Sequence, residues 1–194
     1  MQRLSRLVDG LLTLSGADGA EPPRRPADVA KLIEDRCDAW SALAEERQVD
    51  LVADHHGSGH PVVQLVPGDL DQILDNLLAN ALDASPEGSR IQVELISAEP
   101  GWMEVHVSDE GPGMSDDDRR RAFDRFWQGA GTTGGHSGLG LAIVRQLALR
   151  NDASVELRPA QPTGLVAVIR MAATHRLEAK ATTRPTRDTR FARR

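Results

Sequence analysis

The segment from residue 69 to residue 85, DLDQILDNLLANALDAS, constrains the fold of this chain more than any other part of its 194 residues. Its apolar residues recur every three or four positions and form one stripe of an amphipathic helix: Leu70, Ile73, Leu74, Leu77, Leu78, Ala81 and Leu82. Asp69, which follows Pro67-Gly68, is predicted to cap the helix, with Gln72 at the reciprocal capping position. Such a stripe must be buried against a sheet or other helices.

The other apolar patterns of the chain alternate between helix and strand character. Helices are predicted at 28–48 and 138–150, where apolar residues recur at helical spacing. Short apolar or alternating segments predict strands at 49–53, 62–66, 91–97, 103–108, 154–158 and 165–171. Because the strands are expected to pair mainly with sequence neighbours, with helices between the hairpins, we predict an α+β fold, a two-layer α/β sandwich with a mixed sheet packed against helices.

The ends of the chain differ from this central part. Residues 1–15 (MQRLSRLVDGLLTLS) have the apolar spacing of a helix, and they are interpreted as the end of a longer one. Residues 16–26 (GADGAEPPRRP) are a predicted linker, and 27–172 form the predicted domain. Residues 173–194 carry seven basic and two acidic side chains without apolar periodicity, so we predict a basic disordered tail.

Charge and composition exclude several classes of protein. The formal net charge is −6 and the tail contributes +5, so residues 1–172 carry −11 and make a poor nucleic-acid surface. A polyanion could bind such a body only through a cation and well-placed donors. No run approaches the roughly 18 apolar residues of a membrane span, and no secretory signal is evident. Cys37, the only cysteine, fits a reducing cytosol.

One polar face of the helix at 69–85 is a candidate site. Gln72, Asn76, Asn80 and Asp83 follow one another at helical spacing and share this face beside the apolar stripe. A solvated helix face is the simpler interpretation. Asparagine is nevertheless a weak helix former, whereas its amide oxygen is a suitable neutral ligand for Mg²⁺ and its amide nitrogen can donate to a phosphate.

Two glycine-rich segments are further candidates. Asp109-Glu110-Gly111-Pro112-Gly113-Met114 follows a predicted strand and is either a simple turn or a place where a base approaches the backbone beside a carboxylate. The stretch 134–141 (GGHSGLGL) runs into a helix, whose N-terminal N–H groups suit phosphate oxygens. No Lys-Ser/Thr follows these glycines, so the stretch is not a P-loop, and Leu139 stands where a nucleophile elbow requires glycine.

Aromatic and basic residues lie between these two segments, in Phe123-Asp124-Arg125-Phe126-Trp127. The aromatic residues are compatible with an ordinary core or hinge. Arg125, together with the arginines at 119–121, is the expected local source of positive charge in an acidic body.

Taken in order, these motifs resemble those of a known family. Asn-x3-Asn, Asp-x-Gly-x-Gly, Phe-x2-Phe and Gly-Leu-Gly-Leu resemble the N, G1, F and G2 boxes of the catalytic domain of bacterial histidine kinases. That domain belongs to the superfamily of gyrase, the Hsp90 chaperones and MutL. The resemblance covers about residues 27–172 and implies a Bergerat-type fold with ATP and Mg²⁺ as cofactors. It also implies that 1–15 is the end of a dimerisation helix.

The resemblance implies roles for individual residues. Asn80 would hold Mg²⁺, Asn76 would contact the phosphates, and Arg125 would approach the γ-phosphate, so Asn76 and Arg125 are the implied catalytic residues. Asp109 would bind the adenine amino group. The other implied ATP-binding positions are Asp83, Gly111, Gly113, Met114, Phe126, Gly138, Leu139, Gly140 and Leu141.

Some details depart from the family pattern. Phe126 would anchor a mobile lid at 127–137, in which His136 stands where glycine is common. Asp83 and Ala84 stand where many members have Lys and an aromatic residue. A basic phosphate contact and a ring beside the adenine are therefore not expected from these two positions.

The resemblance implies a protein-histidine kinase domain that transfers the γ-phosphoryl group of Mg-ATP to a histidine on a dimerisation domain, for signalling to a response regulator. None of the six histidines begins the His-Glu/Asp-x-Arg-x-Pro pattern of the acceptor. We therefore expect a catalytic fragment, monomeric alone, from the cytoplasmic part of a homodimeric, membrane-bound sensor. The alternatives are an ATPase or anti-sigma serine kinase, which would usually have Glu in place of Asn76, and a non-catalytic ATP-sensing module.

Overall fold

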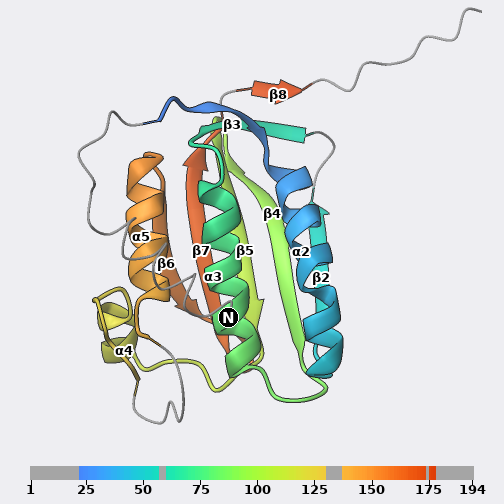
Figure 1. Cartoon of the computed structure of the whole chain (residues 1–194), viewed down its shortest axis with the longest axis vertical. Helices are drawn as coiled ribbons and strands as arrows, with labels where there is room; N and C mark the ends of the chain where they lie inside the picture. The colour runs from blue at the N-terminus through green and yellow to red at the C-terminus, as the bar shows by residue number, and fades with distance from the viewer. Residues whose placement is uncertain (1–21, 57–59, 130–136, 174, 178–194) are drawn as a thin grey trace, which may run out of the picture.

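A computed structural model of the chain describes residues 22–56, 60–129, 137–173 and 175–177. Its main layer is a five-stranded sheet in the order β2-β4-β5-β7-β6 (Figure 1). The strands are β2 (Asp50–His56), β4 (Arg90–Glu99), β5 (Trp102–Asp109), β6 (Ser154–Pro159) and β7 (Leu165–Ala172). β2 pairs with β4 in parallel, and every other pairing in this sheet is antiparallel. The sheet is therefore mixed, as predicted.

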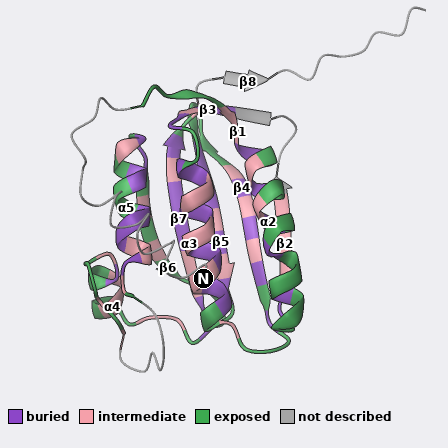
Figure 2. Ribbon diagram, viewed as in Figure 1, coloured by how far each residue is buried: buried purple, intermediate pink, exposed green. Residues whose placement is uncertain are grey.

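Helices form the second layer. α2 (Val29–Glu46), α3 (Asp69–Ala84) and α5 (Gly140–Arg150) lie side by side over one face of the sheet, with α3 in the middle (Figure 1). The predicted stripe of α3 is buried completely, and it packs on the inward residues of the strands, such as Val93, Val105 and Ile169. The buried residues of the helices and of the strands form one core, and Figure 2 shows buried stretches along α3 and along the central strand β7. This arrangement confirms the predicted α+β two-layer sandwich.

A small second sheet corrects two sequence predictions. β3 (His60–Leu65) pairs on one side with β1 (Arg25–Asp28) and on the other with β8 (His175–Leu177), both antiparallel. Arg25 and Pro26, assigned to the linker, thus belong to a strand, and so do three residues of the tail predicted to be disordered. The sequence did not predict these strands because neither segment has an apolar pattern of its own. Each is held in the sheet by backbone hydrogen bonds to β3.

The start of α3 also differs from its prediction. Gly68, with φ 85°, is the N-cap and Asp69 is the first helical residue, without a side-chain capping bond. The buried carboxylate of Asp69 instead accepts hydrogen bonds from Arg150 Nε at 2.8 Å and Asn151 Nδ2 at 2.7 Å. The predicted capping box is wrong because the end of α5 supplies charged and amide donors that the local sequence does not reveal.

Candidate nucleotide-binding site

The two asparagines of α3 lie against the beginning of α5. Asn76 Nδ2 donates to the carbonyl oxygen of Gln72 at 2.7 Å. A methyl group placed on Gly140 would lie 3.2 Å from Oδ1 of Asn76 and 3.6 Å from Oδ1 of Asn80. A side chain at this position would crowd the amide of Asn76, whereas its contact with Asn80 would be an ordinary one, so glycine lets the first turn of α5 lie close to both amides.

The direction of the two helices explains this contact. The start of α3, at Asp69, touches the end of α5, at Arg150, so the helices run antiparallel and Gly140 falls beside the later turns of α3. Within the described part of the chain, no side chain caps the N-terminus of α5. The first N–H groups of a helix suit an anion, and here they lie beside the two amides.

α5 begins two residues later than predicted. Gly138 has φ 65°, in the left-handed region, so the helix cannot include it and starts at Gly140. Leu139 is buried in the core and Leu141 is partly buried against it. These two leucines anchor the first turn of α5, while the glycines between and before them keep the backbone accessible.

Asp109 lies at the last position of β5 and is 8% exposed. Its Oδ1 accepts a hydrogen bond from the N–H of Gly111 at 2.9 Å. Burial raises the pKa of this carboxyl, and hydrogen bonds from the backbone N–H groups of Gly111 and Leu165 oppose the increase. The result is a buried acceptor whose position is fixed by the loop that follows it.

The loop after Asp109 lies between the end of α3 and the turn before β7. A methyl group on Gly111 would lie 2.8 Å from the carbonyl oxygen of Ala84 at the end of α3. A methyl group on Gly113 would lie 2.8 Å from the carbonyl oxygen of Gly164. Gly164 itself, with φ 115°, packs so tightly on the Asp109 carbonyl that no side chain fits there. Sequence reasoning missed Gly164, for which the turn at Pro162-Thr163-Gly164 was the only signal.

The two ends of the predicted lid at 127–137 meet at its base. The N–H of Phe126 donates to the carbonyl oxygen of Gly138 at 2.9 Å. Phe126 has φ 63° and its side chain is 67% exposed, so its backbone, not its ring, joins the two ends. Most of the lid, residues 130–136, lies outside the described residues, so its predicted mobility is untested.

Replacement of Gly138 by alanine is expected to destabilise this base by about 1–3 kcal/mol, the usual cost of a strained backbone position. The new methyl group would lie 2.6 Å from the carbonyl carbon of Phe126, in addition to the unfavourable φ of 65°. The free energy of unfolding in urea measures the loss. Gly101→Ala is the matched control, because Gly101 also has positive φ but has no atom within 4 Å of such a methyl group. Equal losses would show that the close approach does not matter.

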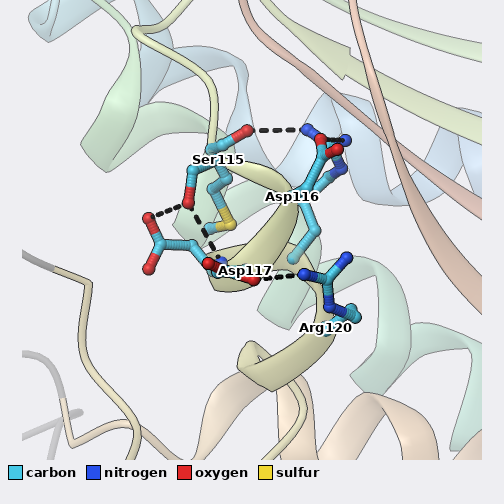
Figure 3. Close-up of polar contacts among 7 residues, drawn as sticks. Ser115, Asp116, Asp117 and Arg120 are labelled. Carbon is cyan, nitrogen blue, oxygen red and sulfur yellow. Dashed lines mark hydrogen bonds and ion pairs between the residues drawn. The ribbon is translucent and has the colours of Figure 1, made fainter.

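The segment between the loop and the lid contains a helix that was not predicted, α4 (Asp116–Arg121). Ser115 caps it by accepting from the N–H of Asp118 at 3.1 Å (Figure 3). Arg120 binds Asp117, as Figure 3 shows. The helix is short, fully charged and without an apolar stripe, so periodicity could not reveal it.

Two of the three arginines of α4 form ion pairs with aspartates of the same helix. Arg119 binds Asp116, and its Nη1 donates to the carbonyl oxygen of Met114 at 2.7 Å. Met114 thus contributes its backbone to fix the end of the glycine loop. With Arg120 also paired, the expected supply of cations at 119–121 is reduced by carboxylates of the same helix.

Asp83 lies on the same face of α3 as the asparagines, one turn beyond Asn80. Its carboxylate is 3.7 Å from Nη1 of Arg47, which follows α2. Arg125 is exposed in the short stretch between α4 and Phe126.

The contacts described above form two groups. Asn76 and Asn80 lie beside the start of α5 at one end of the candidate site, and Asp109, Gly111, Gly113 and Ala84 lie together at the other end.

Comparison with known proteins gives consistent matches. A family model described as "Histidine kinase-, DNA gyrase B-, and HSP90-like ATPase" matches residues 66–191. The signal transduction histidine-protein kinase/phosphatase MprB of Mycobacterium ulcerans (strain Agy99) is 33% identical over 165 residues, covering 84% of this chain and 31% of that protein. MprB of Mycobacterium tuberculosis (strain ATCC 25618 / H37Rv) has the same identity and coverage of this chain.

Two solved structures resemble the fold. A mycobacterial sensor histidine kinase MprB structure superposes with a TM-score of 0.66 at 28% identity, over 77% of this chain and 97% of that one. Full-length ShkA in complex with AMPPNP superposes with a TM-score of 0.77 at 28% identity, over 89% of this chain and 36% of that one. The chain spans about a third of the length of the curated relatives given above.

The sandwich, the paired asparagines beside a helix N-terminus and the buried strand-end carboxylate define the class of ATP-binding domains. The chain belongs to the family of histidine kinase-, DNA gyrase B- and HSP90-like ATPases, and within it corresponds to the ATP-binding catalytic domain of sensor histidine kinases. Among the described residues, no helix is both long and apolar enough to cross a membrane.

Proposed function

We propose that this domain binds Mg-ATP between α3, the loop 109–114 and the start of α5, and transfers its γ-phosphoryl group to a histidine on a dimerisation domain. One observation carries the proposal: Asn76 and Asn80 lie against the N-terminus of α5 through Gly140, which creates a place for phosphates. Adenine would lie at the other end, where Asp109 accepts from its amino group beside Gly111 and Gly113. The crystallised relative ShkA was bound to AMPPNP, an ATP analogue.

The residues present fit a magnesium ion. Mg²⁺ in phosphoryl-transfer sites takes few protein oxygens and is completed by phosphates and water. Asn80 offers an amide oxygen on the half-buried face of α3, beside the helix end expected to hold the phosphates. Asn76 is assigned to a phosphate, with its Nδ2 held by Gln72 and its Oδ1 turned towards Gly140. When bound, the ion would neutralise charge that develops on the phosphates.

The same geometry favours transfer to a histidine over hydrolysis. Asn76 occupies the position at which the hydrolytic relatives are expected to have Glu, and an amide cannot accept the proton of an attacking water. In the proposed reaction an imidazole nitrogen forms a bond to the γ-phosphorus, the bond from that phosphorus to the ADP oxygen breaks, and the imidazole proton is released. Arg125 is assigned to the γ-phosphate as this charge moves. The implied partners are the dimerisation domain and a response regulator, in the cytoplasmic part of a homodimeric sensor.

Incubation with γ-labelled ATP tests the proposal. Because no histidine matches the acceptor pattern, the chain alone should bind ATP, remain unlabelled and hydrolyse ATP slowly. Addition of the matching dimerisation domain should give acid-labile, alkali-stable phosphate on that domain. Much of the rate should come from positioning, which contributes about 7–11 kcal/mol when reacting groups are held in line.

Three outcomes would contradict this assignment. Rapid hydrolysis by the chain alone would favour an ATPase. Labelling of a serine on a partner would favour an anti-sigma kinase. ATP binding without transfer to any dimerisation domain would favour a sensing module.

Sedimentation of the chain alone should show a monomer, because a helix of about two heptads is too short to hold a dimer.

A further inference from the structure

A charged pair lies at the last turn of α3, and the proposed function has so far given it no part. The carboxylate of Asp83 is 3.7 Å from Nη1 of Arg47, the residue that follows α2. Figure 1 shows that α2 and α3 finish at the same end of the helical layer, which lets these two side chains meet. Both are partly exposed, Asp83 at 32% and Arg47 at 52%. A pair so exposed adds little to the stability of the fold.

The order of residues along α3 places this pair between the two ends of the proposed site. Asn80 lies beside Gly140 at the phosphate end. Ala84 lies at the adenine end, where a methyl group on Gly111 would be 2.8 Å from its carbonyl oxygen. Asn80 and Ala84 are about 6 Å apart along the helix axis, and Asp83 lies between them on the exposed side. The sugar that joins adenine to the phosphates must therefore pass the turn that carries Asp83.

The chemistry of an aspartate suits a ribose at this place. An ionised carboxylate only accepts hydrogen bonds, and its two oxygens can accept from neighbouring hydroxyl groups. Dinucleotide-binding folds use an acidic side chain on the ribose 2′-hydroxyl for the same reason.

The charge of the same carboxylate explains the arginine beside it. Asp83 follows Asn80 by less than one helical turn, so its negative charge lies close to the place proposed for the phosphates. Two negative groups at such a distance repel each other when neither is neutralised. The guanidinium of Arg47 lies against the carboxylate and offsets this repulsion.

We propose that Asp83 accepts hydrogen bonds from the ribose hydroxyl groups of the bound nucleotide. Arg47 acts through Asp83 as a positioning residue, which orients the carboxylate and offsets its charge. Asp83 then selects nucleotides that carry ribose hydroxyls, whereas Asp109 selects the base. This inference rests on the proposed binding of Mg-ATP beside α3, but it does not depend on the transfer of the phosphoryl group.

Calorimetric titration of the full chain with ATP and with 2′,3′-dideoxy-ATP, both in the presence of Mg²⁺, tests the ribose contact. The unmodified chain should bind ATP about tenfold more tightly, as expected for one hydrogen bond to a charged group. Asp83→Ala should bring the two affinities to within about twofold, mainly by weakening ATP, because the acceptor for the hydroxyl groups is gone. The helix should persist in this variant, since alanine favours helix.

Asp71→Ala is the matched control on the same helix. Asp71 is 33% exposed and lies 3.6 Å from Nε of Arg36, so its surroundings resemble those of Asp83, but it lies in the first turn of α3. The tenfold preference for ATP should persist in Asp71→Ala. Arg47→Ala should lower the preference for ATP at least about threefold, because Asp83 is no longer held, and Arg47→Lys should restore part of it.

The possible failures are distinguishable from one another. If neither nucleotide binds to the unmodified chain, the proposed function fails and the ribose contact fails with it. Equal affinity of the unmodified chain for both nucleotides would overturn the ribose contact while nucleotide binding stands. An equal loss for both nucleotides in Asp83→Ala would place the pair at the phosphates and would also overturn it. An unchanged preference for ATP in Arg47→Ala would overturn the positioning role of Arg47.

Discussion

Asn80→Ala is expected to weaken binding of Mg-ATP about 10- to 150-fold, the equivalent of the 1.5–3 kcal/mol of a lost bond to a charged group. The loss should fall on the magnesium-dependent part of binding, because the proposed role of Asn80 is to hold the ion beside the N-terminus of α5. Calorimetric titration with ATP, with and without Mg²⁺, measures both parts. The fold should survive, since Asn80 lies on the polar face of α3 and alanine favours helix.

A control on the same helix makes this result specific. Gln72→Ala changes the same polar face two turns earlier, where only the backbone carbonyl of Gln72 binds Asn76. Affinity for Mg-ATP should remain within about threefold in that variant, the ordinary scatter of surface substitutions. If the magnesium dependence survives in Asn80→Ala, the metal is held by another residue. If both variants lose affinity equally, the effect belongs to the helix as a whole.

Asp109→Asn is expected to lower ATP affinity about 5- to 150-fold, because a mismatched polar group in a closed site costs about 1–3 kcal/mol. The carboxylate can only accept from the adenine amino group, whereas an amide can present its own donor to that group. Titrations with ATP and GTP should show that the preference for ATP falls as well. Unchanged ATP affinity would exclude Asp109 from adenine recognition. The backbone should be little altered, since an amide oxygen can still accept from the N–H of Gly111.

Asp109→Asn should not destabilise the fold, although it should weaken ATP binding. Burial raises the pKa of Asp109, so the folded state disfavours its ionised form. This penalty is present at neutral pH and is relieved as the pH falls through the raised pKa towards the ordinary range of Asp. Asp109→Asn removes the penalty, so its melting temperature at pH 7 should equal or exceed that of the unmodified chain. The difference between the two chains should shrink on acidification. A large loss of stability at pH 7 would show that the carboxylate supports the fold.

Local patterns were enough to predict the layers of this protein. The stripe of α3 and the alternation of β4 and β5 repeat every few residues, and a helix or strand buries one side with that same period. The asparagine face, the strand-end carboxylate and the glycines after it were predicted for the same reason. Each is a local pattern at the end or on the side of a regular element.

Contacts between distant parts of the chain were decided only by the tertiary structure. Asp69 was predicted to cap its own helix, but it binds Arg150, 81 positions away, because the antiparallel packing of α3 and α5 places an arginine there. Gly164 was overlooked because its constraint is the carbonyl of Asp109 on a neighbouring strand. β1 and β8 form only because β3 offers them two edges. A sequence states which side of an element is apolar, whereas its partners depend on how the elements pack.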